Sequence, residues 1–420
     1  MVKIAAFKGI RYNPEKVSFR NVITPPYDVI SSEEQNKLYQ KSDYNLIRLE
    51  YGSDYPDDDK NNNRYTRAAQ TFSEWLESDV FVQEKSPVYY WYEQQYNWKG
   101  TTYTREGLIA TLRVEPYEDG NVLPHEETLS KPKEDRLQLL QHCRANFSPI
   151  FGLYPDPQRK VENECAQVKE KQPIIDFTDQ DNQRHRIWIL ENTDIHQRLE
   201  EIFESWPVFL ADGHHRYETA LHFSQMMGAD APENYHHVLI FLFNFYSPGL
   251  LILPTHRAIK GLSNFNAHDF LSKLERYFTV KNYGPSQKEN LSGFIEDIKG
   301  KSHDRYIIGL CISGNFYQLY LNNKEEEARH DVDILQKYVL ENTLNITSDE
   351  QREGELILYT RSEEEALRLV NEGEAQASFF LNPSSIEQVM ATAQEGQRLP
   401  QKSTYFYPKL VSGLLLNKLD

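Results

Sequence analysis

The sequence predicts an α+β protein in which mixed β-sheets pack against helices. Two kinds of pattern lead to this fold class. Residues 88–98 and 101–114 alternate apolar and polar side chains on either side of Lys99-Gly100, which is typical of a β-hairpin. Residues 64–77 instead carry apolar side chains at helical spacing. Strand-like and helix-like segments of these kinds follow one another along the whole chain.

The 420 residues suffice for two or three domains. We expect three regions, at residues 1–120, 121–260 and 261–420. In the first region a strand at residues 4–8 precedes the loop Pro25-Pro26-Tyr27-Asp28, whose prolines fix its path. Asp28 is either a site residue or a turn-capping aspartate. Residues 45–49 alternate like a strand.

The second region opens with a loop rich in groups that can bind a substrate or move a proton. His125, Glu126 and Thr128 precede a helix that contains Arg136. A loop held between rigid elements can position such groups for proton transfer. An ordinary charged loop, with Thr128 or Ser130 as a helix cap, explains the same residues, and taken alone this explanation is favoured.

The chain is organised around residues 205–227. Val208–Ala211 is an apolar run of the right length for a buried strand, and Asp212-Gly213 ends it. Apolar residues at helical spacing then predict a helix that begins near His214. The first N–H groups of a helix have no intrahelical partners. Together with the helix dipole they favour an anion such as a phosphate.

The residues of this first turn suit a phosphate. Gly213 lets the backbone approach a ligand closely, and Arg216 offers a planar fork of donors. His214 and His215 add donors that titrate near pH 7. A solvated first turn capped by Asp212 is the alternative. A metal site at His214-His215 is less favoured, because adjacent helical side chains point about 100° apart.

Two later segments supply further candidate substrate contacts. Thr255-His256-Arg257 follows an apolar strand at residues 250–254, and its basic pair either binds an anion or forms a structural ion pair. Lys402 and Ser403 lie in a polar loop before an aromatic strand. This loop either contacts phosphate or serves only the docking of the C-terminal strand.

Charge and cysteine usage exclude several classes of protein. The 46 basic and 63 acidic residues give a net charge of −17, which argues against general binding to nucleic acid or to a membrane surface. No run approaches the ~18 apolar residues of a membrane helix, and the N-terminal apolar segment is too short for a signal peptide. Three widely spaced cysteines indicate a reducing compartment and no zinc cage. We therefore expect a cytoplasmic protein.

The motif Asp212-Gly213-His214-His215-Arg216 resembles the phosphate-binding motif of the ParB/sulfiredoxin-like superfamily, in particular that of its free-serine kinases. Pro124-His125-Glu126-Glu127 resembles the Pro-His-Glu loop that those kinases carry upstream. Over nearly its whole length the chain also resembles a widespread bacterial and archaeal family long described as a domain of unknown function. The matching segments are residues 25–30, 125–126 with 135–137, 211–220, 254–257 and 402–409.

The resemblance implies a ParB/sulfiredoxin-like nucleotide-binding core and a kinase that uses ATP and Mg²⁺ to convert free L-serine to O-phosphoserine. By position, Glu126 matches the glutamate that takes the proton from the substrate hydroxyl. Glu126, Asp212 and His125 are the catalytic candidates. Asp212 matches a residue near the substrate or metal, and Gly213 to Arg216 match the phosphate holders. We assign the remaining candidates to substrate binding: Thr128, Arg136, Thr255, His256, Arg257, Lys402 and Ser403.

Two other functions fit the same motifs. One is a non-catalytic switch that binds a nucleotide to change shape, as ParB-type proteins do. The other is a reductase of the sulfiredoxin kind, which ranks last because it needs a reactive cysteine where this chain has His215. The chain contains no Gly-x-x-x-x-Gly-Lys-Ser/Thr loop, so any ATP chemistry here requires a different phosphate cradle. The 86 positions between Glu126 and Asp212 (212 − 126) exceed their separation in the compact kinases.

Overall fold

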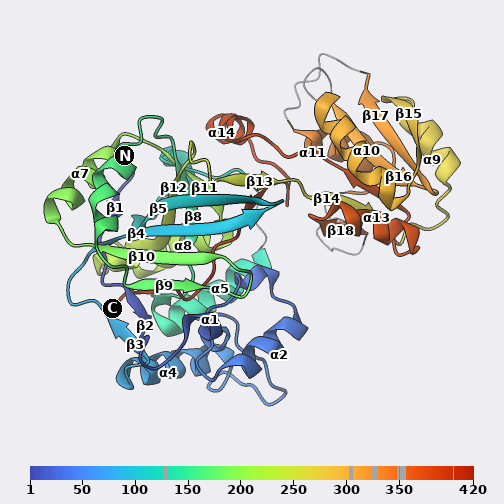
Figure 1. Cartoon of the computed structure of the whole chain (residues 1–420). Coiled ribbons are helices and arrows are strands. Elements are labelled where there is room, and N and C mark those ends of the chain that lie inside the picture. The colour runs from blue at the N-terminus through green and yellow to red at the C-terminus, as the bar shows by residue number, and fades with distance from the viewer. Residues whose placement is uncertain (127–129, 302–305, 323–329, 348–349, 351–355, 401) are drawn as a thin grey trace. The chain divides into compact units, whose positions relative to one another are not determined.

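The computed structural model describes the chain except for residues 127–129, 302–305, 323–329, 348–349, 351–355 and 401 (Figure 1). The described chain divides into two compact units. Unit 1 contains Met1–Leu251 together with Pro408–Asp420, and unit 2 contains Ile252–Tyr407. The chain therefore leaves unit 1, builds unit 2 and returns to unit 1 for its last residues. The three-region division of the sequence stays a prediction.

Unit 1 is built on a mixed sheet that has nine strands among the described residues. In order across the sheet these are β6 (Val122–Leu123), β11 (Val208–Asp212), β8 (Ile150–Tyr154), β12 (His237–Asn244), β5 (Thr101–Arg113), β4 (Tyr89–Trp98), β10 (Arg184–Leu190) and β9 (Ile175–Thr178), with β1 (Ile4–Ala5) paired to β5. Strand β11 is parallel to β6 and antiparallel to β8, and β12 is parallel to β8 and antiparallel to β5. The mixture confirms the predicted α+β class.

The predicted hairpin is present as β4 and β5, with Tyr96 paired to Tyr103 and Trp98 to Thr101. Its two loop residues, Lys99 and Gly100, both have positive φ (49° and 82°). Two left-handed residues in a row twist the loop in the sense that matches the twist of the strands, which is why short hairpin loops favour glycine.

Helices α7 (Thr193–Glu204) and α8 (His214–Met227) pack on the sheet, while α5 (Ser130–Cys143) packs on α8 and α4 (Arg64–Glu77) on α5 (Figure 1). Side chains of α7 and α8, such as Phe203 and Tyr217, share one apolar core with Ile240 of β12. On the opposite face of β12, Phe241 packs against Tyr92 of β4. All eight residues of β12 are buried, as is typical of a central strand with both faces covered.

Residues 45–49 do not form the strand that their alternation predicts. The structure has a short helix there, α3 (Ile47–Glu50). The amide oxygen of Asn45 accepts the N–H of Ile47 at 3.0 Å, so a local side-chain cap supports the helical turn. Leu46, Ile47 and Leu49 are all buried, and a short helix can bury consecutive side chains when it is enclosed by the fold.

The remaining described elements of unit 1 are short: β2 (Ile10–Tyr12), α1 (Phe19–Val22), η1 (Tyr27–Val29), α2 (Ser32–Lys41), β3 (Phe81–Gln83), η2 (Tyr117–Asp119), β7 (Ala145–Asn146), α6 (Lys160–Cys165), η3 (Ala166–Glu170), η4 (Glu233–His236) and β21 (Asn417–Lys418). Strand β21 pairs with β7, which ties the returning C-terminal segment into unit 1.

Unit 2 is an antiparallel sheet with helices on both faces. Its strands run in the order β15 (Phe278–Pro285), β17 (Asn315–Leu321), β16 (Ile307–Ile312), β19 (Ala377–Phe380), β14 (His256–Ile259) and β18 (Ile357–Thr360). Its helices are α9 (Ala267–Leu274), α10 (Lys288–Lys301), α11 (Asp331–Ile334), η5 (Leu335–Glu341), α13 (Glu363–Asn371) and α14 (Ile386–Gln394). Strands β13 (Leu251–Leu253) and β20 (Tyr405–Tyr407) pair with each other where the chain passes between the units.

Candidate functional site

The pairing of β6 with β11 joins the two motifs that the sequence singled out. Val122 lies opposite Val208 and Leu123 opposite Phe209, in parallel register. In a parallel pair both strands end at the same edge of the sheet. Continuing this register brings the His125-Glu126 loop level with the end of β11 and the turn at Asp212. The two motifs therefore meet in space although 86 positions separate Glu126 from Asp212 (212 − 126).

Gly213 makes the sharp turn from β11 into α8. Its backbone is left-handed, with φ 88° and ψ 27°, and it is the N-cap residue of the helix. A Cβ at this position would lie 2.9 Å from Cγ2 of Ile150, closer than real side chains approach. Glycine is therefore required both by φ and by the neighbouring strand. As an N-cap it has no side chain that could accept hydrogen bonds from the first turn of α8.

The rings of His125 and His214 hold the loop against the helix. Their centroids lie 4.9 Å apart at an interplanar angle of 69°. Nδ1 of His125 donates to the carbonyl of Leu210 at 2.7 Å, and the backbone N–H of His125 is 3.5 Å from Nε2 of His214. Burial lowers the pKa of His214 well below 6.5, and nearby His125 lowers it further. The His214 ring is thus a neutral, buried group, and its predicted phosphate contact rests on its backbone N–H.

Asp212 lies between two cations. Nη2 of Arg216 donates to Oδ2 of Asp212 at 3.0 Å, and Nζ of Lys409 donates to Oδ1. Burial alone would raise the pKa of Asp212, but Lys409 and Arg216 outweigh it and lower the pKa. The other amino group of Arg216 donates to the carbonyl of Pro149. Asp212 is therefore an ionised carboxylate whose two oxygens each have a cationic partner.

The Pro-Pro-Tyr-Asp loop and helix α5 lie beside the first turn of α8. Burial lowers the pKa of His215, whereas Glu218 and Asp28 raise it, so Asp28 lies within electrostatic reach of this turn. From α5, Nζ of Lys133 donates to Oε2 of Glu218 at 2.9 Å. Carboxylates and cations therefore alternate around the Asp-Gly-His-His-Arg motif.

Arg136 belongs to a buried ion network behind the Pro-Pro-Tyr-Asp loop. Nη1 of Arg136 donates to the backbone oxygen of Glu50 at 2.8 Å and lies 3.3 Å from its carboxylate, which also accepts Ser148 Oγ at 2.7 Å. The guanidinium carbon lies 4.0 Å from the centre of the Tyr27 ring. Burial raises the pKa of Tyr27 to about 12. Arg136 thus supports the loop that carries Tyr27, and a direct substrate contact for it stays a prediction.

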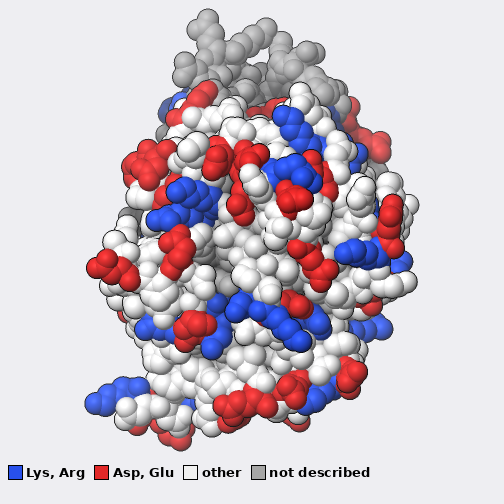
Figure 2. All heavy atoms as spheres, turned by 90° about the vertical axis from the view of Figure 1, so that its left-hand side faces the viewer, with Lys and Arg blue, Asp and Glu red and all other residues white. Residues whose placement is uncertain are grey.

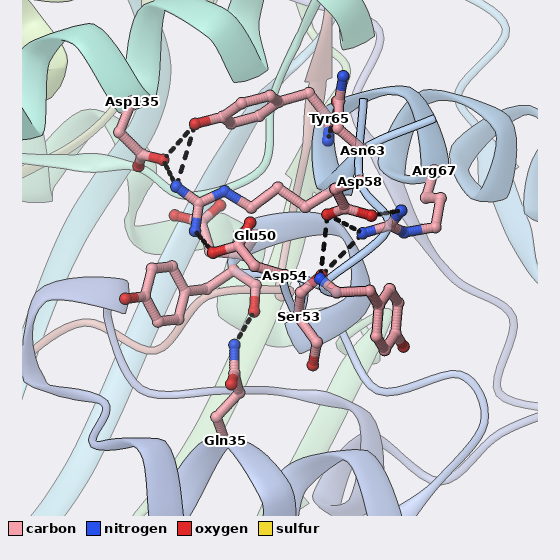
Figure 3. Close-up of polar contacts among 12 residues, drawn as sticks. Gln35, Glu50, Ser53, Asp54, Asp58, Asn63, Tyr65, Arg67 and Asp135 are labelled. Atoms are coloured by element: carbon pink, nitrogen blue, oxygen red, sulfur yellow. Dashed lines mark hydrogen bonds and ion pairs between the residues drawn. The ribbon is translucent and has the colours of Figure 1, made fainter. Parts of the chain in front are cut away.

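The network continues outward through Asp135. Nε of Arg136 donates to Asp135 Oδ2 at 2.8 Å, and Arg64 donates to Asp135 Oδ1. In Figure 3 the hydroxyl of Tyr65 points toward the carboxylate of Asp135, with 2.8 Å between the oxygens. Through Asp135 and Arg136, helix α4 and the segment before it are thereby connected to the Pro-Pro-Tyr-Asp loop beside the candidate site.

The other candidate residues belong to unit 2 or lie outside the described residues. Thr128 lies outside the described residues. Thr255, His256 and Arg257 are buried at β14, in unit 2, and Lys402 and Ser403 also belong to unit 2. The guanidinium of Arg257 lies 5.7 Å from the centre of the Tyr359 ring. Substrate binding by these residues stays a prediction.

Sequence reasoning missed Lys409. The sequence points to Lys402 and Ser403 in this segment, but Lys409, seven positions after Lys402 (409 − 402), contacts Asp212. The signal that could have found it is its place in the same matching segment, residues 402–409. Spacing alone cannot indicate that the chain returns to unit 1 at Pro408.

Among the described residues, no group of three or more His, Cys, Asp or Glu side chains is arranged to hold a metal ion. In the same part of the chain, no helix is both long and apolar enough to cross a membrane. Figure 2 shows acidic and basic side chains interspersed over one face of the molecule.

Residues 4–343 match the family described as "Protein of unknown function (DUF1015)". The chain belongs to this family. The match covers more than half of the sequence and confirms the predicted family membership. No curated protein matches the chain.

Three solved structures have a weaker likeness to this DUF1015 chain. A free serine kinase in complex with AMP is 14% identical, with 68% of this chain and 84% of that chain covered and a TM-score of 0.37. A conserved hypothetical protein from Pyrococcus furiosus is also 14% identical, with coverages of 71% and 93% and a TM-score of 0.37. SbnI with a C-terminal truncation, from Staphylococcus aureus, is 10% identical, with coverages of 72% and 85% and a TM-score of 0.34.

Proposed function

We propose that this protein binds ATP at the N-terminus of α8 and transfers the terminal phosphoryl group to the hydroxyl of free L-serine. One observation carries the proposal. The parallel pairing of β6 and β11 brings the Pro-His-Glu loop to the Asp-Gly-His-His-Arg motif. These are the two motifs by which the sequence resembles free-serine kinases, and a phosphoryl transfer needs both a phosphate cradle and a proton acceptor.

The phosphate cradle is the first turn of α8. Gly213 leaves the helix start without a capping side chain, and the helix dipole adds partial positive charge there. Arg216 and Lys409 are cations at the same turn, on either side of Asp212. Transfer of a phosphoryl group depends mainly on positioning the reactants and neutralising charge on the moving group.

Glu126 is the proposed proton acceptor. The serine hydroxyl oxygen attacks the γ-phosphorus, the bond between this phosphorus and the β,γ-bridging oxygen breaks, and ADP leaves. The hydroxyl proton passes to the Glu126 carboxylate. His125 is a positioning residue in this scheme, because its ring is bound to Leu210 and packs on His214 directly before Glu126.

Mg²⁺ fits the donor set of this site, because it usually retains several waters and binds through phosphate oxygens with one or two carboxylates. Asp28 is a carboxylate near the motif that would hold it, which leaves Glu126 to accept the proton. Asp212 has cationic partners on both oxygens. The ion would supply neutralisation of phosphate charge.

Turnover by the purified full-length protein tests the proposal. With ATP, Mg²⁺ and L-serine we expect O-phosphoserine and ADP in equal amounts. Glu126→Gln should lower turnover about 10²- to 10⁴-fold, the usual contribution of a general base, and leave nucleotide affinity unchanged. Glu118→Gln, at an exposed carboxylate in η2, is the control and should retain full activity. Absence of phosphorylated product from serine, threonine and homoserine would refute a kinase.

One observation favours a second candidate, a nucleotide-binding switch without catalysis. Lys409 and Arg216 are already paired with Asp212, so an incoming phosphate must compete for these cations and change their contacts. A switch predicts tight ATP binding that is lost in Arg216→Ala, with no product. Calorimetry and the turnover assay on the same samples separate the two functions.

A further inference from the structure

The last 13 residues of the chain, Pro408–Asp420, belong to unit 1 although unit 2 precedes them. They are held by backbone pairing: Ser412 bridges Thr24, Leu416 bridges Ile10, and β21 pairs with β7. Leu414, Leu415 and Leu416 are almost fully buried. This segment is therefore part of the core of unit 1.

The start of the segment is fixed by a buried arginine. Nη2 of Arg105 donates to the carbonyl of Pro408 at 2.7 Å, and Nε of Arg105 donates to Gln94 at 2.8 Å. The guanidinium carbon lies beside the contacting rings of Phe151 and Phe243, at 5.0 and 4.8 Å from their centres. The residue that follows Pro408 is Lys409, whose Nζ reaches Asp212.

Lys409 decides the charge of the ion cluster at the start of α8. Asp212, Arg216 and Lys409 together carry one net positive charge, whereas Asp212 and Arg216 alone carry none. The side chains are partly enclosed, with 18% of Asp212 and 14% of Lys409 exposed. In such surroundings charges are screened less than at the open surface, so one unit of charge matters for an anionic ligand.

We propose that Lys409 is a phosphate-binding residue of the nucleotide site. Before a nucleotide binds, the Asp212 carboxylate holds the ammonium group of Lys409. When a nucleotide binds, a phosphate replaces this carboxylate beside the ammonium group. This inference rests on the proposed function and adds to it a residue from the far C-terminal segment. Asp212 then acts as a positioning residue that keeps the lysine at the helix start. Arg105 supports Lys409 indirectly, because its hydrogen bond to the carbonyl of Pro408 fixes the preceding residue.

Two probes, ADP and adenosine, differ only in their phosphate groups and test the inference. Each is titrated into the full-length protein, and calorimetry measures its affinity. Lys409→Met should weaken ADP binding about 10-fold or more and leave adenosine binding unchanged. Lys409→Arg, which retains the charge, should restore most of the ADP affinity. Lys418→Met is the matched control, because this lysine lies on the same segment and pairs at 3.5 Å with the terminal residue Asp420.

The outcomes distinguish this inference from the proposed function. If wild-type protein binds ADP and Lys409→Met binds it equally well, Lys409 holds no phosphate, while the nucleotide site itself stands. If ADP and adenosine weaken together, Lys409 has only a structural role and the inference fails. If wild-type protein binds neither ADP nor ATP, the proposed function fails and this inference with it. Should Lys409→Met not fold, the same two affinities measured in Lys409→Gln decide.

Discussion

The imidazole rings of His125 and His214 lie edge to face with centroids 4.9 Å apart, although 89 positions separate the two residues in sequence. His125 is additionally bound through Nδ1 to Leu210 in β11. This pair of rings fastens the loop that carries Glu126 to the helix start that carries the phosphate motif. The geometry of the candidate site therefore depends on a contact between two buried imidazole rings.

His125→Ala should lower both the free energy of unfolding and the rate of turnover, and the two effects can be measured separately. The substitution removes a buried ring and a hydrogen bond, which we expect to cost about 2–4 kcal/mol of unfolding free energy. Because Glu126 loses its anchor, turnover should fall more than nucleotide affinity. Urea unfolding and steady-state kinetics measure the two effects. His222→Ala is the control, because His222 is an exposed histidine on α8. Equal losses in both variants would contradict the anchoring role.

His214 should make the free energy of unfolding decrease as the pH falls below 6.5, the ordinary pKa of a histidine. Burial lowers the pKa of this ring well below 6.5, and His125 and His215 lower it further while Asp212 opposes them. As pH falls through 6.5, the unfolded chain takes up a proton at this position and the folded protein does not. The free energy of unfolding therefore decreases with falling pH, by up to about 1.4 kcal/mol per pH unit for one group.

Comparison with His214→Gln isolates this contribution. The variant cannot take up the proton, so its unfolding free energy should fall less steeply than that of the wild type between pH 6.5 and 5. The difference between the two proteins at pH 8, where neither state carries the proton, gives the cost of the substitution itself. Parallel profiles over the whole range would show that the ring titrates normally in the folded protein.

Gly213→Ala should be more destabilising than alanine at another left-handed glycine. A Cβ at Gly213 meets Ile150 at 2.9 Å in addition to the strain of positive φ, so we expect a loss of about 2–3 kcal/mol. Gly120 has a similar backbone, with φ 75° and ψ 6°, but no atom lies within 4 Å of its Cβ position. Gly120→Ala should therefore cost only about 1 kcal/mol. Thermal or urea unfolding of both variants checks the comparison, and equal losses would show that Ile150 moves aside.

The sequence predicted the parts of this site better than their arrangement. The strand Val208–Ala211, the turn at Gly213 and the helix from His214 follow from local patterns, and the structure has all three. The strand expected at residues 45–49 is a helical turn instead, because Asn45 caps the turn and the surrounding fold buries Leu46, Ile47 and Leu49. The meeting of His125 with His214, and of Lys409 with Asp212, depends on strand order and on the return of the chain from unit 2. Neither contact can be predicted from a local pattern in the sequence.

The buried pair of Glu50 and Arg136 gives the last prediction. Glu50 is 2% and Arg136 6% exposed, and burial raises the pKa of Glu50 although Arg136 and Ser148 oppose it. Glu50→Ala leaves a buried guanidinium without this partner, which should cost about 3–5 kcal/mol. Because Arg136 faces the ring of Tyr27, the Pro-Pro-Tyr-Asp loop should also loosen, visible as faster amide exchange in residues 27–30, which follow its two prolines.

An exposed ion pair supplies the control for this experiment. Glu33 and Lys37 lie 2.7 Å apart on α2 with most of both side chains in solvent, so Glu33→Ala should change stability by no more than about 0.5 kcal/mol. Substituting the buried pair together, as Glu50→Leu with Arg136→Met, should recover part of the loss, because no charge is then left without a partner. The double variant could instead be as unstable as Glu50→Ala, with amide exchange in the Pro-Pro-Tyr-Asp loop unchanged from the wild type. The network would then support the core of unit 1 and not the loop beside the candidate site.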